Sequence, residues 1–115
     1  MRLTILTLPI STNNLYAHVG RRRFLLPRAR DNKETMALEM RTQYRGKPLE
    51  GSLEADVTIY WPDKRKHDAD NVKALLDSAT GILWLDDSQI TDLHSRKRYD
   101  KTNPRVELSV EPATV

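Results

Sequence analysis

The sequence predicts a small α/β (α+β) domain in which two helices pack on one mixed β-sheet of about four strands, in the order βαβαββ. Three observations predict this class. Residues 52–61 alternate between apolar and polar side chains, as in a half-buried strand. Residues 28–45 and 70–81 combine helix formers with helical spacing of their apolar residues. The 115 residues suffice for one modest core and contain no repeat or linker, so residues 1–115 are expected to form a single domain.

The first half of the chain is expected to contribute one strand and one helix. Residues 2–8 form the strand, because their side chains alternate and Pro9 follows them. Residues 11–27 are expected to be a loop, since they are rich in Asn and Arg and are bounded by prolines. The helix over residues 28–45 carries an apolar stripe at four-residue spacing, which we expect to face the core: Met36, Met40 and Tyr44.

The centre of the chain is expected to contribute the main strand and the second helix. Residues 52–61 direct five apolar side chains to one face, and Pro62 ends the strand. The helix begins at Asp70 or Asn71, either of which can cap it, and Gly81 ends it.

The remaining residues are expected to complete the sheet. The apolar segment 82–85 is long enough to run back beside the strand over residues 52–61. Two further strands are expected near residues 89–98 and 104–111. Both tryptophans, Trp61 and Trp84, have strand-like surroundings and are expected in the core rather than on a binding surface.

Composition excludes several classes of function. The chain has no cysteine, which rules out disulfides, thiolate zinc sites and thiol catalysis. No apolar run approaches the roughly 20 residues of a membrane-spanning helix, and the first ten residues lack the features of a signal peptide. We therefore expect a cytoplasmic protein with no membrane partner and no nucleotide cofactor.

Basic residues gather in three clusters although the net charge is only +3. Each cluster alone is typical of solvated loop charges, but three together favour a surface that binds a polyanion such as DNA. The loop before the first cluster adds an asparagine and an aromatic residue. The predicted DNA contacts are Arg21, Arg22, Arg23, Lys64, Arg65, Lys66, Arg96, Lys97, Asn14 and Tyr16.

Four aspartates form the candidate reactive site. Asp68 and Asp70 lie between a strand end and a helix start, and Asp86 and Asp87 follow that helix beyond a turn. If segment 82–85 returns along the sheet, the two pairs lie close together. A cluster of carboxylates without Cys or His suits a hard cation such as Mg²⁺, which metal-assisted phosphodiester cleavage requires. The residues alone leave a second interpretation open, in which Asp70 is only a helix cap and Asp86–Asp87 only a turn.

A resemblance to a known family favours the metal site. The run DADN at residues 68–71, Lys73, Leu75-Leu76-Asp77, Gly81 and DDSQI at residues 86–90 resemble the signature of the RusA family of Holliday-junction resolvases. The stretch LPISTNNLY at residues 8–16 resembles the N-terminal motif of that family, so the resemblance extends over residues 3–111. It implies a Mg²⁺-dependent crossover junction endodeoxyribonuclease, with Mn²⁺ as a possible substitute, that cuts two opposed strands of a four-way junction. Such proteins are bacterial or phage-encoded.

The resemblance also assigns roles to single residues. The catalytic, metal-binding aspartates fall on Asp68, Asp70 and Asp87, and Asp86 is a fourth ligand or an orienting group. The catalytic lysine falls on Lys73, which lies three residues after Asp70 where the family usually has four. Residues at i+3 and i+4 share a helix face, so Lys73 stays within reach of the scissile phosphate. The alternative is a surface lysine that pairs with Asp70 or Asp77. His67, next to Asp68, is expected to be an exposed loop histidine.

The expected partners are branched DNA and a second copy of the chain. One such domain supplies one carboxylate cluster, whereas resolving a junction needs two symmetry-related cuts, which a twofold homodimer provides. A sheet edge or the N-terminal loop is the expected contact between subunits. Two other functions remain open: a less selective Mg²⁺-dependent nuclease, and a DNA-binding protein whose acidic cluster is structural or inactive.

Overall fold

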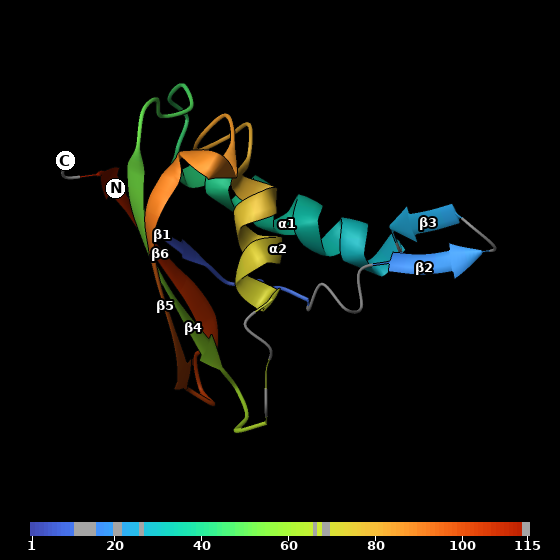
Figure 1. Cartoon of the computed structure of the whole chain (residues 1–115). Coiled ribbons are helices and arrows are strands. Elements are labelled where there is room, and N and C mark those ends of the chain that lie inside the picture. Colours follow the sequence, from blue (N-terminus) through green and yellow to red (C-terminus); the bar gives the residue numbers. More distant parts are fainter. Residues whose placement is uncertain (11–15, 20–21, 26, 66, 68–69, 114–115) are drawn as a thin grey trace.

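Four strands form one mixed sheet in the computed structural model, which describes residues 1–10, 16–19, 22–25, 27–65, 67 and 70–113 (Figure 1). The strand order across the sheet is β1-β6-β4-β5. β4 pairs with β5 in parallel and with β6 antiparallel, and β1 pairs antiparallel with β6. The strands are β1 (Arg2–Ile5), β4 (Leu53–Trp61), β5 (Ile90–Tyr99) and β6 (Arg105–Pro112). The predicted α+β class is thereby confirmed.

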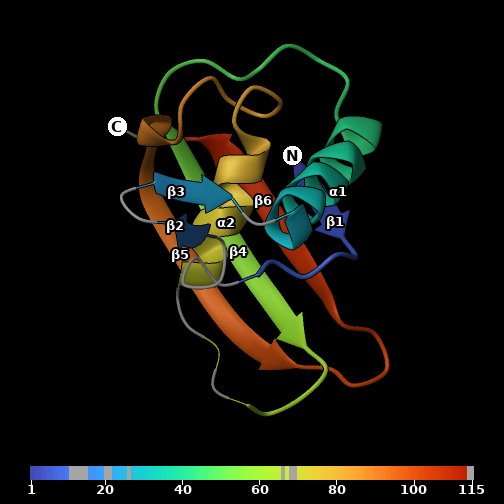
Figure 2. The same ribbon diagram turned by 90° about the vertical axis from the view of Figure 1, so that its right-hand side faces the viewer.

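Two helices, α1 (Pro27–Gln43) and α2 (Asp70–Ala79), cover one face of this sheet (Figure 2). The alternation along β4 is confirmed, because every second side chain from Leu53 to Trp61 is buried against the helices. Met36 and Met40 of α1 are fully buried, as their four-residue spacing predicts. Both tryptophans belong to the same core. Neither helix is long and apolar enough to cross a membrane, and the described residues contain no other candidate.

The loop expected at residues 11–27 is wrong in part, because it contains a β-hairpin. Strands β2 (Tyr16–Val19) and β3 (Arg22–Leu25) pair antiparallel in a two-stranded sheet of their own. The hairpin stands away from the main sheet, beside the start of α1 (Figure 1). Tyr, Val and Phe favour strands, but the arginines and histidine between them hide any period-two pattern. The element order therefore gains two strands between the first strand and the first helix.

The course predicted for residues 82–85 is also wrong. Gly81, at φ +88°, ends α2 as expected, but the chain then makes a tight turn and does not run beside β4, whose neighbours are β5 and β6. In this turn the Leu49 amide donates to the Leu83 carbonyl at 2.8 Å, and the Gly81 amide donates to the Trp84 carbonyl at 2.6 Å. Three consecutive apolar residues, Ile82–Trp84, are all buried. Such a run fills the end of a core and gives no strand register.

The two edges of the main sheet differ. At β1, the side chain of Gln43 accepts from the Thr4 amide at 2.9 Å and donates to the Thr4 carbonyl at 2.6 Å. The Glu39 carboxylate accepts from the amides of Leu6 and Thr7, so the strand ends at Ile5 and not at residue 8. At β5, by contrast, all side chains after Ile90 are exposed. The β4–β5 register also shifts by one residue between Leu53 and Glu54.

Candidate active site

Asp86 and Asp87 lie on a short turn that leads from α2 into β5. Asp86 caps the 3₁₀ helix η2 (Asp87–Gln89), accepting a hydrogen bond from the Ser88 amide at 3.1 Å. The Gln89 side chain accepts from the amides of Leu85 (2.9 Å) and Asp86 (3.1 Å), which completes a capping box. Gln89 was not predicted as a site residue, although Asp-x-x-Gln at a helix start is a recognisable signal for this role.

Gln89 also ties this acidic turn to the chain before β4. Its Nε2 donates to the carbonyl of Leu49 at 2.9 Å and to that of Gly51 at 3.0 Å. One side chain therefore uses its oxygen to hold the acidic turn and its nitrogen to hold the neighbouring loop. These contacts of Gln89, together with the cap by the Asp86 side chain, fix the position of the acidic turn.

The carboxyl groups of Asp86 and Asp87 interact strongly. Partial burial raises the pKa of Asp87, with further contributions from its hydrogen bond to Asp86 and from repulsion by Asp77 and Asp86, and Lys73 opposes this. The pKa of Asp86 is lowered, mainly by the hydrogen bond from the Ser88 amide and then by its hydrogen bond with Asp87. Two carboxyl groups this close do not both ionise readily unless a cation joins them.

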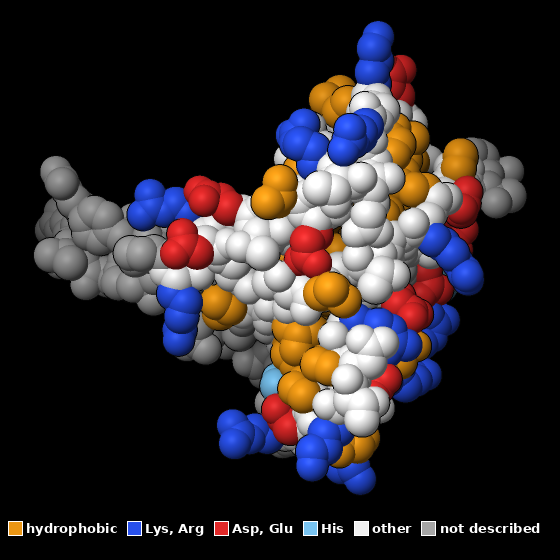
Figure 3. All heavy atoms as spheres, turned by 180° about the vertical axis from the view of Figure 1, so that it is seen from behind, with side chains coloured by type: hydrophobic (Ala, Val, Ile, Leu, Met, Phe, Trp, Pro, Cys, Tyr) orange, Lys and Arg blue, Asp and Glu red, His pale blue; other side chains and the backbone are white. Residues whose placement is uncertain are grey.

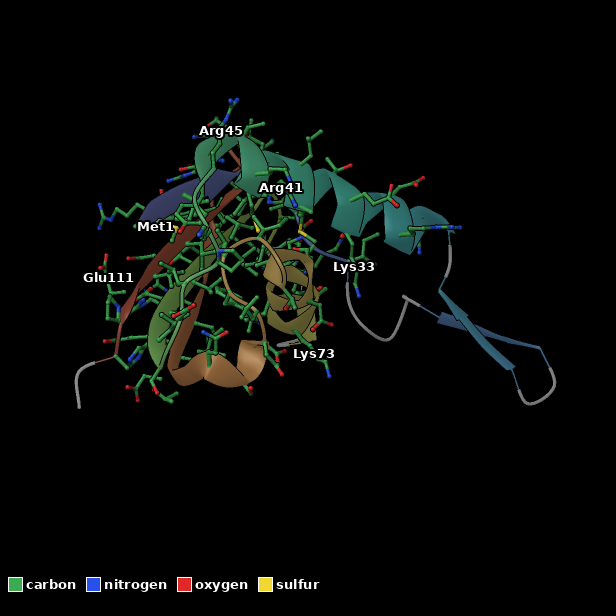
Figure 4. The ribbon with its side chains drawn as sticks, turned by 90° about the horizontal axis from the view of Figure 1, so that it is seen from above. Met1, Lys33, Arg41, Arg45, Lys73 and Glu111 are labelled. Carbon is green, nitrogen blue, oxygen red and sulfur yellow. The ribbon has the colours of Figure 1, made fainter. Side chains whose placement is uncertain are left out.

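Lys73 and Asp77 of α2 face this turn, and α1 adds a second lysine. Figure 4 shows Lys33 reaching from α1 and Lys73 from α2. Lys33 Nζ lies 3.8 Å from the Asp77 carboxylate, so the ion pair of Asp77 in the described structure is with Lys33. Lys73 is exposed and close enough to influence Asp87. Lys33 and the location of Asp77 were missed, because the packing of α1 on α2 is not visible in either helix alone.

The other two predicted ligands cannot be added to this turn. Asp68 lies outside the described residues, and Asp70 begins α2 but its side chain is not described. Among the residues that the structure describes, no three His, Asp or Glu side chains are grouped closely enough to hold a metal ion. The convergence of all four aspartates therefore stays a prediction. The expected donors are all carboxylate oxygens, which suit a hard divalent cation.

The chain just before Asp68 is anchored to the end of the sheet. The His67 ring stacks on Trp61 with centroids 3.6 Å apart, and His67 Nε2 lies 2.9 Å from Asp63 Oδ1. Lys97 Nζ donates to the His67 carbonyl at 2.9 Å. The contact with His67 is the largest cause of the lowered pKa of Asp63. The expectation of an exposed histidine is wrong, since only 20% of the His67 side chain is accessible; neither Asp63 nor Trp61 gave a sequence signal for this contact.

The predicted DNA-binding residues are distributed over several surfaces. Lys64 and Arg65 are exposed where β4 ends, at the end of the sheet where Lys and Arg side chains gather in Figure 3. Lys97 shares a sheet face with the helices, whereas Arg96 points to the opposite face and pairs with Asp56 at 2.6 Å. The remaining candidates are outside the described residues (Asn14, Arg21 and Lys66) or in the hairpin without described side chains (Tyr16, Arg22 and Arg23).

An acidic turn opposite a lysine, with exposed basic residues at the other end of the same sheet, fits an enzyme that binds and cleaves a phosphodiester polymer. The family model described as "Endodeoxyribonuclease RusA" matches residues 8–111, and the chain belongs to this family of DNA-cleaving hydrolases. It is similar to "Crossover junction endodeoxyribonuclease RusA" of Aquifex aeolicus (strain VF5). The identity is 28% over 116 residues, which cover 97% of this chain and 91% of the relative. Nucleases of the family generally depend on a divalent metal ion.

Proposed function

We propose that the protein resolves four-way DNA junctions by paired, symmetric cleavage of two opposed strands, with Mg²⁺ as its metal ion. The name of the Aquifex relative and the family match over residues 8–111 support this activity. The observation that carries it in the structure is the acidic turn: Asp86 and Asp87 are held by Gln89 and face Lys73 on α2.

In this proposal Asp68, Asp70 and Asp87 hold the metal, and Asp86 is a fourth ligand or orients Asp87. A bound Mg²⁺ would supply an activated water and neutralise charge on the cleaved phosphate. Lys73 binds a non-bridging oxygen of that phosphate and stabilises the charge that develops on it. Lys33 pairs with Asp77 of α2. This ion pair keeps the Asp77 carboxylate from competing with the phosphate for Lys73.

The decisive experiment compares an immobile four-way junction with a linear duplex of the same sequence, end-labelled on each strand in turn. We expect symmetric cuts in the junction, dependent on Mg²⁺ or Mn²⁺ and abolished by EDTA. Equal cutting of the duplex would identify a less selective nuclease. Binding without cleavage under any divalent ion would identify a DNA-binding protein with an inactive acidic cluster.

The basic clusters are proposed to bind the junction backbone. In the body of the domain these residues are Lys64, Arg65, Lys66 and Lys97. Arg96 was predicted with them, but it pairs with Asp56 on the opposite face of the sheet. The hairpin and the chain before it contribute the rest: Asn14, Tyr16, Arg21, Arg22 and Arg23. Replacing Arg21, Arg22 and Arg23 together with alanine should flatten the salt dependence of binding, by about one log–log unit for each phosphate that the arginines neutralise. An unchanged slope would show that these arginines face away from DNA.

A twofold homodimer is proposed to supply the two active sites. The β1 edge is occupied by side chains of α1, which leaves β5 and the hairpin as candidate contacts. An isolated two-stranded hairpin is marginally stable in water, so packing of β2–β3 on a partner subunit explains its separate position best. Sedimentation should give about twice the 13.3 kDa chain mass. A supercoiled cruciform should then be converted directly to linear DNA, whereas a monomer releasing nicked circles would contradict the paired mechanism.

A further inference from the structure

An open hollow lies where β4 and β5 both end, away from the acidic turn. Its volume is about 490 Å³, and its lining consists of Trp61, Asp63, Lys64, Arg65, Lys97, Arg98 and Tyr99. Pockets of a few hundred Å³ are the size that receives a small organic ring system. Because β4 and β5 are parallel, the last residues of both strands lie at this same end of the sheet.

The base of the hollow is aromatic. Trp61 and Tyr99 are register partners on neighbouring strands and therefore lie on the same face of the sheet. Trp61 is buried, but Tyr99 is 49% exposed, and Lys64 Nζ lies 5.1 Å from the centroid of its ring. A half-exposed aromatic face that already attracts a cation is a surface on which a nucleobase can stack.

The rim of the hollow has more basic than acidic side chains, because Lys64, Arg65, Lys97 and Arg98 lie around one carboxylate, Asp63, which binds His67. On the outer face of the sheet Arg96 pairs with Asp56 at 2.6 Å and His94 lies 3.6 Å from Glu54. Around the hollow, Lys64 and Lys97 form no ion pair within 4 Å with any carboxylate that the structure describes. Two lysines without a carboxylate partner beside an aromatic surface fit a ligand that has both a ring and a phosphate.

The chain that lines the hollow at Asp63 is held in place by contacts of the nearby His67. His67 stacks on Trp61 and binds Asp63, and Lys97 holds the His67 carbonyl. The next residue along the chain is Asp68, a proposed metal ligand. The hollow is therefore separated from a proposed metal ligand by only a few residues of sequence.

We propose that this hollow binds one unstacked nucleobase of the DNA strand, with its ring on Tyr99 and its flanking phosphate against Lys64 and Lys97. The inference rests on the proposed function, because it assigns the hollow to a strand that is already bound for cleavage. Bases at the crossing point of a four-way junction are the least costly to unstack, since their pairing and stacking are already strained.

The first test measures binding of a fluorescent four-way junction in EDTA, so that no cleavage occurs. Tyr99→Ala and Tyr99→Leu should weaken binding about tenfold, since both lose the aromatic face, whereas Tyr99→Phe should bind as the wild type does. Tyr60→Ala is the matched control, because Tyr60 lies next to Trp61 on β4 but on the opposite face of the sheet. Equal affinity of Tyr99→Leu and the wild type would overturn the proposal.

The second test places a single abasic site at successive positions around the crossing point. At one position the abasic site should weaken binding of the wild type about tenfold and leave binding of Tyr99→Ala unchanged. Removing the base and removing the Tyr99 ring should abolish the same contact, so the second change has no further effect. Identical abasic profiles for the two proteins would show that the hollow contacts backbone alone and would overturn the inference. Failure of the wild type to prefer the intact junction over duplex is a separate result, which would refute the proposed function.

Discussion

The two edge strands of the main sheet differ in how far other parts of the protein cover them. At β1, Gln43 and Glu39 of α1 bind the backbone groups that the strand leaves unpaired, and the strand is only four residues long. At β5, every residue after Ile90 is exposed, from just beyond the acidic turn to Tyr99. Proteins normally shorten or cover an edge strand, because an open one is a liability. We propose that the uncovered edge is the one that the protein uses.

The two ends of β5 are assigned to different functions. The acidic turn precedes Ile90 and lies opposite Lys73, and we assign this end to cleavage. Lys97 and Tyr99 lie at the other end, which we assign to DNA binding. Variants at the first end should lower the cleavage rate, variants at the second should lower affinity, and variants at the β1 edge should change only stability.

The largest effect is expected from Asp87→Asn. Loss of a proposed metal ligand should lower the junction cleavage rate on the order of 100-fold or more, while binding stays equal or becomes tighter because a negative charge is removed. Single-turnover cleavage and anisotropy measure the two quantities. Asp92→Asn, at an exposed aspartate near the start of β5, is the control and should keep full activity. Full activity in Asp87→Asn would remove this end of β5 from the active site.

Lys73→Ala should lower the cleavage rate by roughly ten- to a hundredfold with a much smaller loss of affinity, if the lysine acts on the transition state. Lys33→Ala serves as the comparison and should lower the rate less, because Lys33 pairs with Asp77 and affects Lys73 only indirectly. If rate and affinity fall by the same factor in Lys73→Ala, the lysine only binds DNA. The assignment of cleavage to the Ile90 end of β5 would then lose its support from Lys73.

Gln89→Leu and Gln43→Leu compare the two edges directly. Each removes side-chain hydrogen bonds to backbone groups, and each should lower the free energy of unfolding by about 1–2 kcal/mol, measured by urea denaturation. Only Gln89→Leu should also lower cleavage, by about tenfold, because it frees the turn that carries Asp86 and Asp87. Loss of cleavage in Gln43→Leu at full folding would contradict the view that the β1 edge is purely structural.

The smallest effect is expected from the neighbouring pair Lys97 and Arg96. Lys97→Ala should reduce the slope of log affinity against log salt by about one unit, as expected when one phosphate is no longer neutralised. Arg96→Ala should leave the slope nearly unchanged, because Arg96 already pairs with Asp56 on the other face. Reversed results would place the bound DNA on the outer face of the sheet.

The sequence predicted those parts of the fold that depend on one segment at a time. The period-two pattern of residues 52–61 and the spacing of Met36 and Met40 report burial directly, and both are confirmed. The hairpin was missed because its strands are short and the second begins with two arginines. The turn at residues 82–85 was placed wrongly because a continuous apolar run has no period, so it is compatible with several paths through a core.

The site was predictable as a set of residue types but not as a set of contacts. Asp86 and Asp87 stood out by their resemblance to a family signature, yet the residue that holds them, Gln89, acts through backbone groups of a loop about forty residues earlier. The same limit applies to His67, whose partner Trp61 becomes its neighbour only when the chain turns at the end of β4. Long-range contacts of this kind leave no local pattern.

The register shift in β5 gives the edge strand one residue more than its pairing with β4 requires. β4 and β5 change register between Leu53 and Glu54, so Thr91 is one extra residue in the edge strand. A chain without Thr91 would pair regularly with β4, and Lys97 and Tyr99 would stay opposite Ile59 and Trp61. An insertion after Asp92 has no such remedy, because successive side chains point to opposite faces and one added residue would exchange those that follow it. The two ends of β5 therefore tolerate a single-codon deletion between them better than a single-codon insertion.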